Sequence, residues 1–159
     1  MLHVTLTAVD RVRPLRREVL RVGQGFGAAS FGGDDAAETL HVAAIDGGSG
    51  RVVGCASVMV EPHDGIAHRL RGMAVDPAWQ GRGVGTRVLR RIEDELRRRG
   101  ADAMWCKARV PAVGFYERQG WRCVGEAYDV PPHGPHRTMV RAFGAPSEPL
   151  AASPRRFAD

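Results

Sequence analysis

The spacing of apolar residues changes within residues 67–100, from a strand-like to a helical pattern. Residues 67–75 are largely apolar and end at Asp76-Pro77, where the proline lacks the N–H that a strand ladder requires. After a short loop, apolar residues recur at helical spacing and arginines fill most of the positions between them. The pattern predicts a strand at 67–75 and an amphipathic helix that ends before Gly100, with an apolar face formed by Val84, Val88, Leu89, Ile92 and Leu96.

Similar patterns place the other elements along the chain. One further helix begins near Asp10, its expected N-cap, with Pro14 close to its start, and another spans 111–119. The turn signal at 46–50 joins two strands into an antiparallel hairpin, and a second turn is predicted at 61–65. The remaining predicted strands span residues 3–8, 38–45, 51–60, 103–108, 121–128 and 137–141.

Length and composition favour one globular domain. The chain has 159 residues, 43% of them hydrophobic, which is enough to bury a core. Residues 144–159 contain three prolines and no periodicity, and we predict a disordered tail there. No apolar run approaches the length of a membrane span and charged residues appear by Asp10, so we expect a cytoplasmic protein with no membrane partner.

Cysteine and charge content narrow the function classes. Cys55, Cys106 and Cys123 are odd in number and lack metal-ligand spacing, so neither a disulfide framework nor a metal site is predicted. The formal net charge is +5, but the basic residues are interspersed with acidic ones and carry no nucleic-acid recognition signature. Lys107 is the only lysine among 23 basic residues, which indicates a compositional bias toward arginine. We therefore do not expect nucleic acid as the partner.

The loop before the long helix has the properties of an anion-binding site. Three glycines occur within residues 81–85, and glycine lets a backbone approach a ligand closely. The first N–H groups of a helix have no internal partner, and the helix dipole makes that end attractive to phosphate. Gln80 and Arg82 can add side-chain donors. These features predict a phosphate cradle at 80–86, with an unliganded strand-to-helix turn as the alternative.

The glycine spacing distinguishes among the known phosphate-binding loops. A Walker loop does not fit, because Gly85 stands where it requires a lysine. A dinucleotide-binding loop does not fit either: no register supplies its third glycine, and residues 76–80 separate the strand from the loop. The pattern that is met is (Arg/Gln)-x-x-Gly-x-(Gly/Ala), by Gln80, Gly83 and Gly85. It resembles the acyl-CoA pyrophosphate loop of the GNAT superfamily of N-acyltransferases.

A second motif strengthens the resemblance. The strand-like stretch Trp105–Arg109 is followed by Phe115-Tyr116 on the short predicted helix, and then by Gly120-Trp121 ahead of the next strand. This order is similar to the strand, helix and glycine-aromatic step of GNAT proteins. The resemblance implies an α/β (mixed α+β) fold in a single domain over residues 1–143. Its sheet would be central, mixed and mostly antiparallel, with about six or seven strands flanked by about four helices.

The resemblance also implies a reaction. An N-acetyltransferase of this kind moves the acetyl group of acetyl-CoA directly to a primary amine of a small molecule or peptide in a ternary complex, without a metal. A non-catalytic acyl-CoA-binding or regulatory module is the alternative, and a homodimer is compatible with the sequence. Lys107 stands where many relatives carry an asparagine that contacts CoA. The residues expected to contact acetyl-CoA are Met73, Ala74, Val75, Gln80, Gly81, Arg82, Gly83, Val84, Gly85, Thr86 and Lys107.

Two side chains are expected to transfer protons. Tyr116 matches the family's general acid, which protonates the departing CoA thiolate. His68, on the strand that leads into the loop, is the candidate base for the amine, because histidine titrates near neutral pH. Glu61, His41, His136 and a water chain are alternatives. The sequence does not identify the acceptor, which would be selected by loops at residues 23–35, 61–66 and 129–136.

Overall fold

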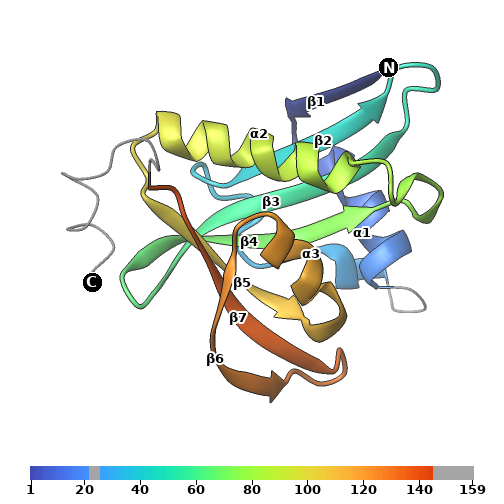
Figure 1. Ribbon diagram of the computed structural model, residues 1–159. Helices are drawn as coiled ribbons and strands as arrows, with labels where there is room; N and C mark the ends of the chain where they lie inside the picture. The colour runs from blue at the N-terminus through green and yellow to red at the C-terminus, as the bar shows by residue number, and fades with distance from the viewer. Residues whose placement is uncertain (22–25, 145–159) are drawn as a thin grey trace. The chain divides into compact units, whose positions relative to one another are not determined.

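The computed structural model describes residues 1–21 and 26–144. Within these ranges the chain forms seven strands and three α-helices, together with short 3-10 helices (Figure 1). Residues 145–159, almost the whole of the predicted tail, lie outside the described residues, as do residues 23–25 of the predicted loop 23–35. The mixed α/β class and the number of strands are confirmed, with three α-helices where about four were predicted.

The strands lie in one sheet. They are β1 (Leu2–Leu6), β2 (Leu40–Asp46), β3 (Val52–His63), β4 (Ile66–Val75), β5 (Ala103–Arg109), β6 (Arg122–Asp129) and β7 (Pro135–Ala142). Their order is β1-β2-β3-β4-β5-β7-β6. The pairs β1–β2, β2–β3, β5–β7 and β6–β7 are antiparallel, as predicted for a mostly antiparallel sheet.

The helices are α1 (Arg13–Leu20), α2 (Val84–Arg98) and α3 (Val113–Arg118). α2 begins at Val84, the first residue of the predicted apolar face, and Gly100 follows the helix with a φ of +87°. The prediction that Asp10 caps α1 is wrong, because residues 9–11 form a 3-10 turn and α1 starts behind it with Pro14 in its first positions. None of the described helices has both the length and the apolar content needed to span a bilayer.

The hairpin between β3 and β4 is longer than predicted. Residues 61–63 continue β3, although Pro62 suggested a turn there, and only Asp64 and Gly65 reverse the chain. Both of these residues have positive φ, +49° and +81°, which is the geometry of a tight two-residue hairpin turn. The correction places Glu61, an alternative base candidate, on a strand and not in a loop.

The chain divides into two compact units. The first comprises Met1–Val60 with Leu70–Glu95, and the second comprises Glu61–Arg69 with Leu96–Asp159. The glycine-rich loop and residues 73–75 therefore belong to the first unit. Tyr116, His68 and Lys107 belong to the second.

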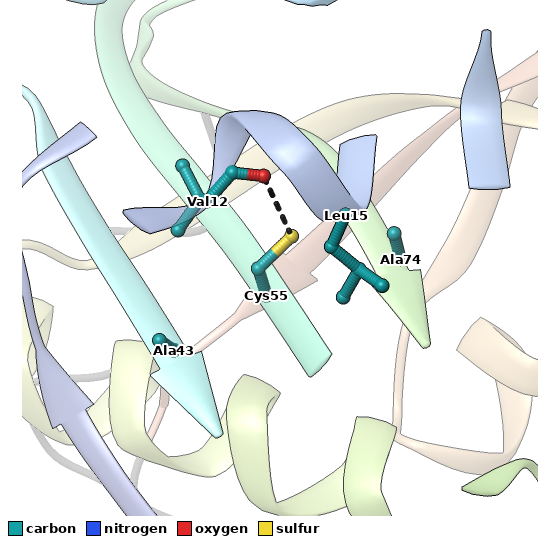
Figure 2. Packing of buried hydrophobic residues seen from close by; sticks show 5 residues of the cluster. All are labelled: Val12, Leu15, Ala43, Cys55 and Ala74. Atoms are coloured by element: carbon teal, nitrogen blue, oxygen red, sulfur yellow. Dashed lines mark hydrogen bonds between the residues drawn. The ribbon is translucent and has the colours of Figure 1, made fainter. Parts of the chain in front are cut away.

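One face of the sheet in the first unit is covered by α1. Side chains alternate between the two faces along a strand, so one residue in two points toward the helix. Figure 2 shows the thiol of Cys55 on β3 directed at the carbonyl oxygen of Val12. These contacts build a small apolar cluster of Val12, Leu15, Ala43, Cys55 and Ala74.

The other face is covered by α2, which lies very close to β3 at Gly54. The methyl groups of Val84 and Val88 fill the space that a side chain at position 54 would occupy. A Cβ added to Gly54 would lie 2.5 Å from Val84 Cγ1. Glycine at this position therefore allows the first turn of α2, immediately after the glycine-rich loop, to pack against the sheet.

We expect Gly54→Ala to lower the free energy of unfolding by about 1–3 kcal/mol, because the added methyl group overpacks the contact with a stiff β-branched side chain. Chemical denaturation of both proteins measures this difference. Gly32→Ala is the matched control, because an added Cβ at Gly32 meets no atom within 4 Å. Equal stability of the Gly54 variant and the control would show that α2 does not depend on this close approach.

Candidate active site

A short, internally bonded turn connects β4 to the glycine-rich loop. The backbone N–H of Asp76 donates to Val53 O at 2.8 Å. The Asp76 carboxylate accepts from the N–H of Ala78 at 2.9 Å and pairs with Arg51 Nη2 at 3.0 Å. Residues Pro77–Trp79 complete one 3-10 turn. Residues 76–80, which have no counterpart in a dinucleotide-binding loop, are therefore held in place by hydrogen bonds and support the glycine-rich loop.

The loop itself contains two exposed glycines in the left-handed region of backbone conformation. Gly81 and Gly83 have φ of +79° and +80°, a conformation that side chains disfavour, and Arg82 lies between them. A Cβ built on either glycine would meet no atom of the described residues within 4 Å, so the space beside these two glycines is open. Among the loop and turn hydrogen bonds of the described residues, none has an N–H of residues 81–86 as its donor. The backbone amides of a glycine-rich segment at the start of a 15-residue helix suit an anion.

The two polar side chains predicted to assist the loop behave differently from one another. Gln80 donates from Nε2 to the carbonyl oxygen of Val75 at 3.2 Å, so its amide group ties the loop back to the end of β4. Arg82 is exposed, and its guanidinium lies over the indole ring of Trp79. The side chain of Gln80 is therefore used in a hydrogen bond within the protein, whereas the guanidinium of Arg82 is accessible to solvent.

Residues 73–75, at the end of β4, were predicted to contact acetyl-CoA, and the direction of each backbone N–H decides which of them could donate to a ligand. Successive N–H groups of a strand point to opposite edges. The Asp76 N–H points to β3, because it donates to Val53, so by this alternation the Ala74 N–H also points to β3. The amides of Met73 and Val75 consequently point to the edge away from β3.

Tyr116 is the one buried residue of α3. Its ring packs edge-on against Phe115 and Trp121, with centroids 5.3 Å and 5.1 Å away. Within the described residues its hydroxyl makes no hydrogen bond, so the O–H is not committed to the protein's own core. Burial raises the pKa of Tyr116 well above 10, and proximity to Cys106 adds to the shift. The phenol therefore keeps its proton at neutral pH.

His68 lies half-buried on the part of β4 that belongs to the second unit. Burial lowers the pKa of His68 below its ordinary value of 6.5, and the positive charge of Arg99 lowers it further. A depressed pKa leaves the imidazole neutral near pH 7. A neutral imidazole has one nitrogen with a free electron pair, which is the requirement for a proton acceptor.

The alternative base candidates have other partners. Both oxygens of Glu61 accept from Arg69 Nη1 at 3.0 Å. His41 is buried and uses both ring nitrogens, one toward Ser57 and one toward a backbone carbonyl. His136 is buried with its Nδ1 2.8 Å from the Gly134 carbonyl oxygen. Its second nitrogen is therefore the one able to accept a proton. Of the three histidines, His68 and His136 keep a ring nitrogen without a bond to the described residues, and Glu61 is held by its ion pair with Arg69.

The remaining predicted residues of interest are Lys107 and the cysteines. Lys107 is exposed on β5, opposite Thr138 of β7. Burial raises the pKa of Cys55 to about 12 and raises that of Cys106 further, so neither forms a thiolate at neutral pH. Among the described residues, no group of three His, Cys, Asp or Glu side chains could hold a metal ion.

A buried ionic network in the first unit was missed by sequence reasoning. Arg16 on α1 is 0% exposed, and its guanidinium binds both carboxylate oxygens of Asp34, at 2.9 Å and 3.0 Å. It also donates to the carbonyl of Ala29 at 3.0 Å and to the Ser57 hydroxyl at 2.7 Å. Arg16 follows Val12 by four residues and therefore lies on the same, apolar face of α1. This position of a charged residue was the one feature of the sequence that could have indicated a buried ion pair.

His41 closes this network. Its Nε2 lies 3.0 Å from the backbone oxygen of Asp34, which can only accept, so Nε2 carries the proton. Its Nδ1 then accepts from the Ser57 hydroxyl at 2.7 Å, while the Ser57 oxygen accepts from Arg16. We call Arg16, Asp34, Ser57 and His41 the Arg16 network. It links Asp34 to Arg16 of α1 and to His41 of β2, and Ser57 of β3 bonds both of these side chains.

The fold and the sequence lead to the same class of protein, the acetyltransferases. The model of the acetyltransferase (GNAT) family matches residues 17–121, and the chain belongs to this family. The relatives include the uncharacterized N-acetyltransferase YitI of Bacillus subtilis (strain 168). It is 29% identical over 145 residues, which cover 90% of this chain and 97% of that protein.

Solved structures agree in fold. An acyl-CoA N-acyltransferase from Pseudomonas aeruginosa superposes with a TM-score of 0.74 at 23% identity, over 89% of this chain and 100% of its own. An aminoglycoside 6'-N-acetyltransferase complexed with coenzyme A gives a TM-score of 0.72 at 17% identity, over 90% and 98%. At these identities the likeness concerns the fold, and the sequence-based assignment to the GNAT superfamily is confirmed by the family match.

Proposed function

We propose that this protein is an N-acetyltransferase that transfers the acetyl group of acetyl-CoA directly to a primary amine of a small molecule or peptide. The observation that carries the proposal is the glycine-rich loop. No N–H of residues 81–86 is a donor among the loop and turn hydrogen bonds of the described residues, and a Cβ built on Gly81 or Gly83 meets no described atom within 4 Å. Those amides, with Arg82, suit the diphosphate of CoA.

The end of β4 suits the reactive part of the co-substrate. Extended pantetheine can bind along a strand edge as another strand would. The amides of Met73 and Val75, which point away from β3, are the donors for that edge. One of them would polarise the thioester carbonyl and stabilise the oxyanion formed when the amine attacks, a contribution of about 3 kcal/mol for one preorganised donor.

Proton transfers are assigned to the second unit. The amine must lose a proton before or during attack, and the neutral imidazole of His68 is our candidate acceptor. When the tetrahedral intermediate collapses, the C–S bond breaks and the CoA sulfur needs a proton. Tyr116, which stays protonated and whose hydroxyl has no hydrogen-bond partner in the described residues, would supply it.

The acceptor is an amine whose identity a direct assay can find. The relatives include a glucosamine 6-phosphate N-acetyltransferase from Oryza sativa subsp. japonica, 32% identical over 89 residues, so amino sugars belong in the test. We would measure CoA release with amino sugars, aminoglycosides, amino acids, polyamines and peptides. Acetyl-CoA binding without turnover on any amine would favour a binding module instead.

Tyr116→Phe is expected to lower kcat by about 10²–10³-fold and to leave the Kd for acetyl-CoA within a factor of two, because only proton transfer is lost. Steady-state kinetics and calorimetry measure the two quantities. Because the pKa of Tyr116 is raised, its ionisation should produce no alkaline limb below pH 10. Tyr128→Phe is the control, since that hydroxyl bonds Thr138 at 2.9 Å. Full kcat in Tyr116→Phe across the pH range would remove Tyr116 from the mechanism.

A further inference from the structure

Arg82, the cation of the glycine-rich loop, is held by a neighbouring side chain. The central carbon of its guanidinium lies 4.8 Å from the centroid of the Trp79 indole ring. Trp79 is half-buried, whereas Arg82 is exposed. A cation over the face of a tryptophan is attracted by the ring quadrupole, and tryptophan is the strongest of the aromatic residues in this respect. The ring therefore restricts where the guanidinium can go.

The position of Trp79 is itself fixed. It ends the 3-10 turn of residues 77–79, and its backbone N–H donates to Asp76 O at 2.8 Å. Asp76 is in turn tied to β3 through Val53 and to Arg51. The indole is thus carried by a bonded turn at the base of the loop, and it holds a cation that stands between the two open glycines.

A long side chain that is already held in its binding conformation binds an anion more tightly than a mobile one. A free arginine loses rotamer freedom when it binds an anion, and this loss weakens the interaction. A guanidinium that already lies against a ring loses less. Residues 76–80, which distinguish this loop from a dinucleotide-binding loop, place the Trp79 ring beside the Arg82 guanidinium.

We propose that Trp79 is a positioning residue for the diphosphate site: it orients Arg82 so that the guanidinium contacts the diphosphate of acyl-CoA. The inference rests on the proposed function, since acyl-CoA is the ligand named there. Trp79 contacts no reacting atom in this scheme, and its whole effect passes through Arg82.

A double-mutant cycle tests this dependence. The Kd of acetyl-CoA is measured by calorimetry for the wild type, Trp79→Leu, Arg82→Ala and the double variant. We expect Arg82→Ala to weaken binding about tenfold, as for a hydrogen-bonded charge. Trp79→Leu should weaken it about two- to fivefold when Arg82 is present, the range of an exposed cation–π contact, and not at all when Arg82 is absent.

Two controls separate positioning from a general effect. Arg87 is an exposed arginine on the first turn of α2 whose Nη2 bonds Leu2 O at 3.2 Å, so a Trp79→Leu/Arg87→Ala cycle should be additive. Trp79→Phe keeps an aromatic face and should retain part of the affinity. Melting temperatures are recorded for every variant. If Trp79→Leu does not fold, the cycle is run with Trp79→Phe.

The outcomes distinguish this inference from the proposed function. Dephospho-CoA keeps the diphosphate but lacks the 3'-phosphate, so the same coupling is expected with it. Coupling that vanishes with dephospho-CoA would overturn the assignment to the diphosphate. Additive effects of Trp79→Leu and Arg82→Ala in a wild type that binds acetyl-CoA would overturn the inference alone. A wild type that does not bind acetyl-CoA would overturn the proposed function and the inference with it.

Discussion

Gly83→Asp is expected to weaken acetyl-CoA binding by about 100-fold or more. The backbone at Gly83 has a φ of +80°, and its open side faces the space assigned to the diphosphate. A carboxylate there would occupy that space and bring a negative charge to within a few ångströms of the phosphates, where the repulsion amounts to about 4 kcal/mol for a pair near a protein surface. Calorimetry with acetyl-CoA measures the loss.

Gly50→Asp is the matched control for this variant. Gly50, in the turn between β2 and β3, has a φ of +76° and nothing within 4 Å of an added Cβ. The two substitutions thus impose the same backbone strain and the same charge, but only one lies in the loop. Gly83→Ala separates the strain from the charge at position 83. Unchanged affinity in Gly83→Asp would show that the loop does not hold the diphosphate.

Asp34→Asn is expected to have the largest effect on stability, a loss of about 3–5 kcal/mol in the free energy of unfolding. Arg16 is fully buried, and Asp34 is its only carboxylate partner among the described ion pairs. A buried cation without its counter-ion is strongly destabilising, because the desolvation of the charge is no longer offset. Chemical denaturation with a circular dichroism readout measures the change.

Asp35→Asn is the control for this second prediction. Asp35 is the next residue, 86% exposed at its side chain, and its contact with Arg13 is 3.7 Å long. An exposed pair contributes little, so this variant should stay within about 0.5 kcal/mol of the wild type. A loss in Asp34→Asn no larger than that of Asp35→Asn would mean that the Arg16 network does not stabilise the fold.

The Arg16 network also predicts a dependence on pH. Burial by itself would raise the pKa of Asp34, but hydrogen bonds from Arg16 and from the Phe31 N–H outweigh it and hold the pKa below the ordinary 3.8. Because the pKa in the folded state is lower than in the unfolded state, the stabilisation is complete above pH 3.8 and is lost as the pH falls through the folded-state value. Asp34→Asn should lack this part of the acid sensitivity.

Local patterns in the sequence were enough for much of the fold and for the loop. The start of α2 at Val84 follows from helical periodicity behind a run of glycines, and Gly100 follows as its end. The errors lie where local signals conflict with pairing elsewhere in the chain. Pro62 signals a turn, but β3 continues through it to His63, and Asp10 resembles an N-cap although the helix starts beyond it.

The candidate site divides in the same way. The identity of the loop residues was readable from Gln80, Gly83 and Gly85, because glycine spacing reflects backbone conformation within a few residues. The direction of each side chain was not. Gln80 turns back to Val75, and Arg82 lies on Trp79, and both contacts depend on how residues 76–80 fold. The partners of His41 and Glu61 also depend on the tertiary structure, and no local pattern indicated them.

The sequence by itself determined the family and, through that resemblance, the class of fold, and it located the long helix α2, since the two motifs and the helical periodicity are each local patterns. The tertiary structure decided which polar groups are already bonded to the protein. Arg16 meets Asp34 18 positions away and Ser57 41 positions away. No local pattern encodes such contacts, because they form only when α1 packs against β3. Burial of the Arg16 charge is then unfavourable unless it is paired and hydrogen-bonded.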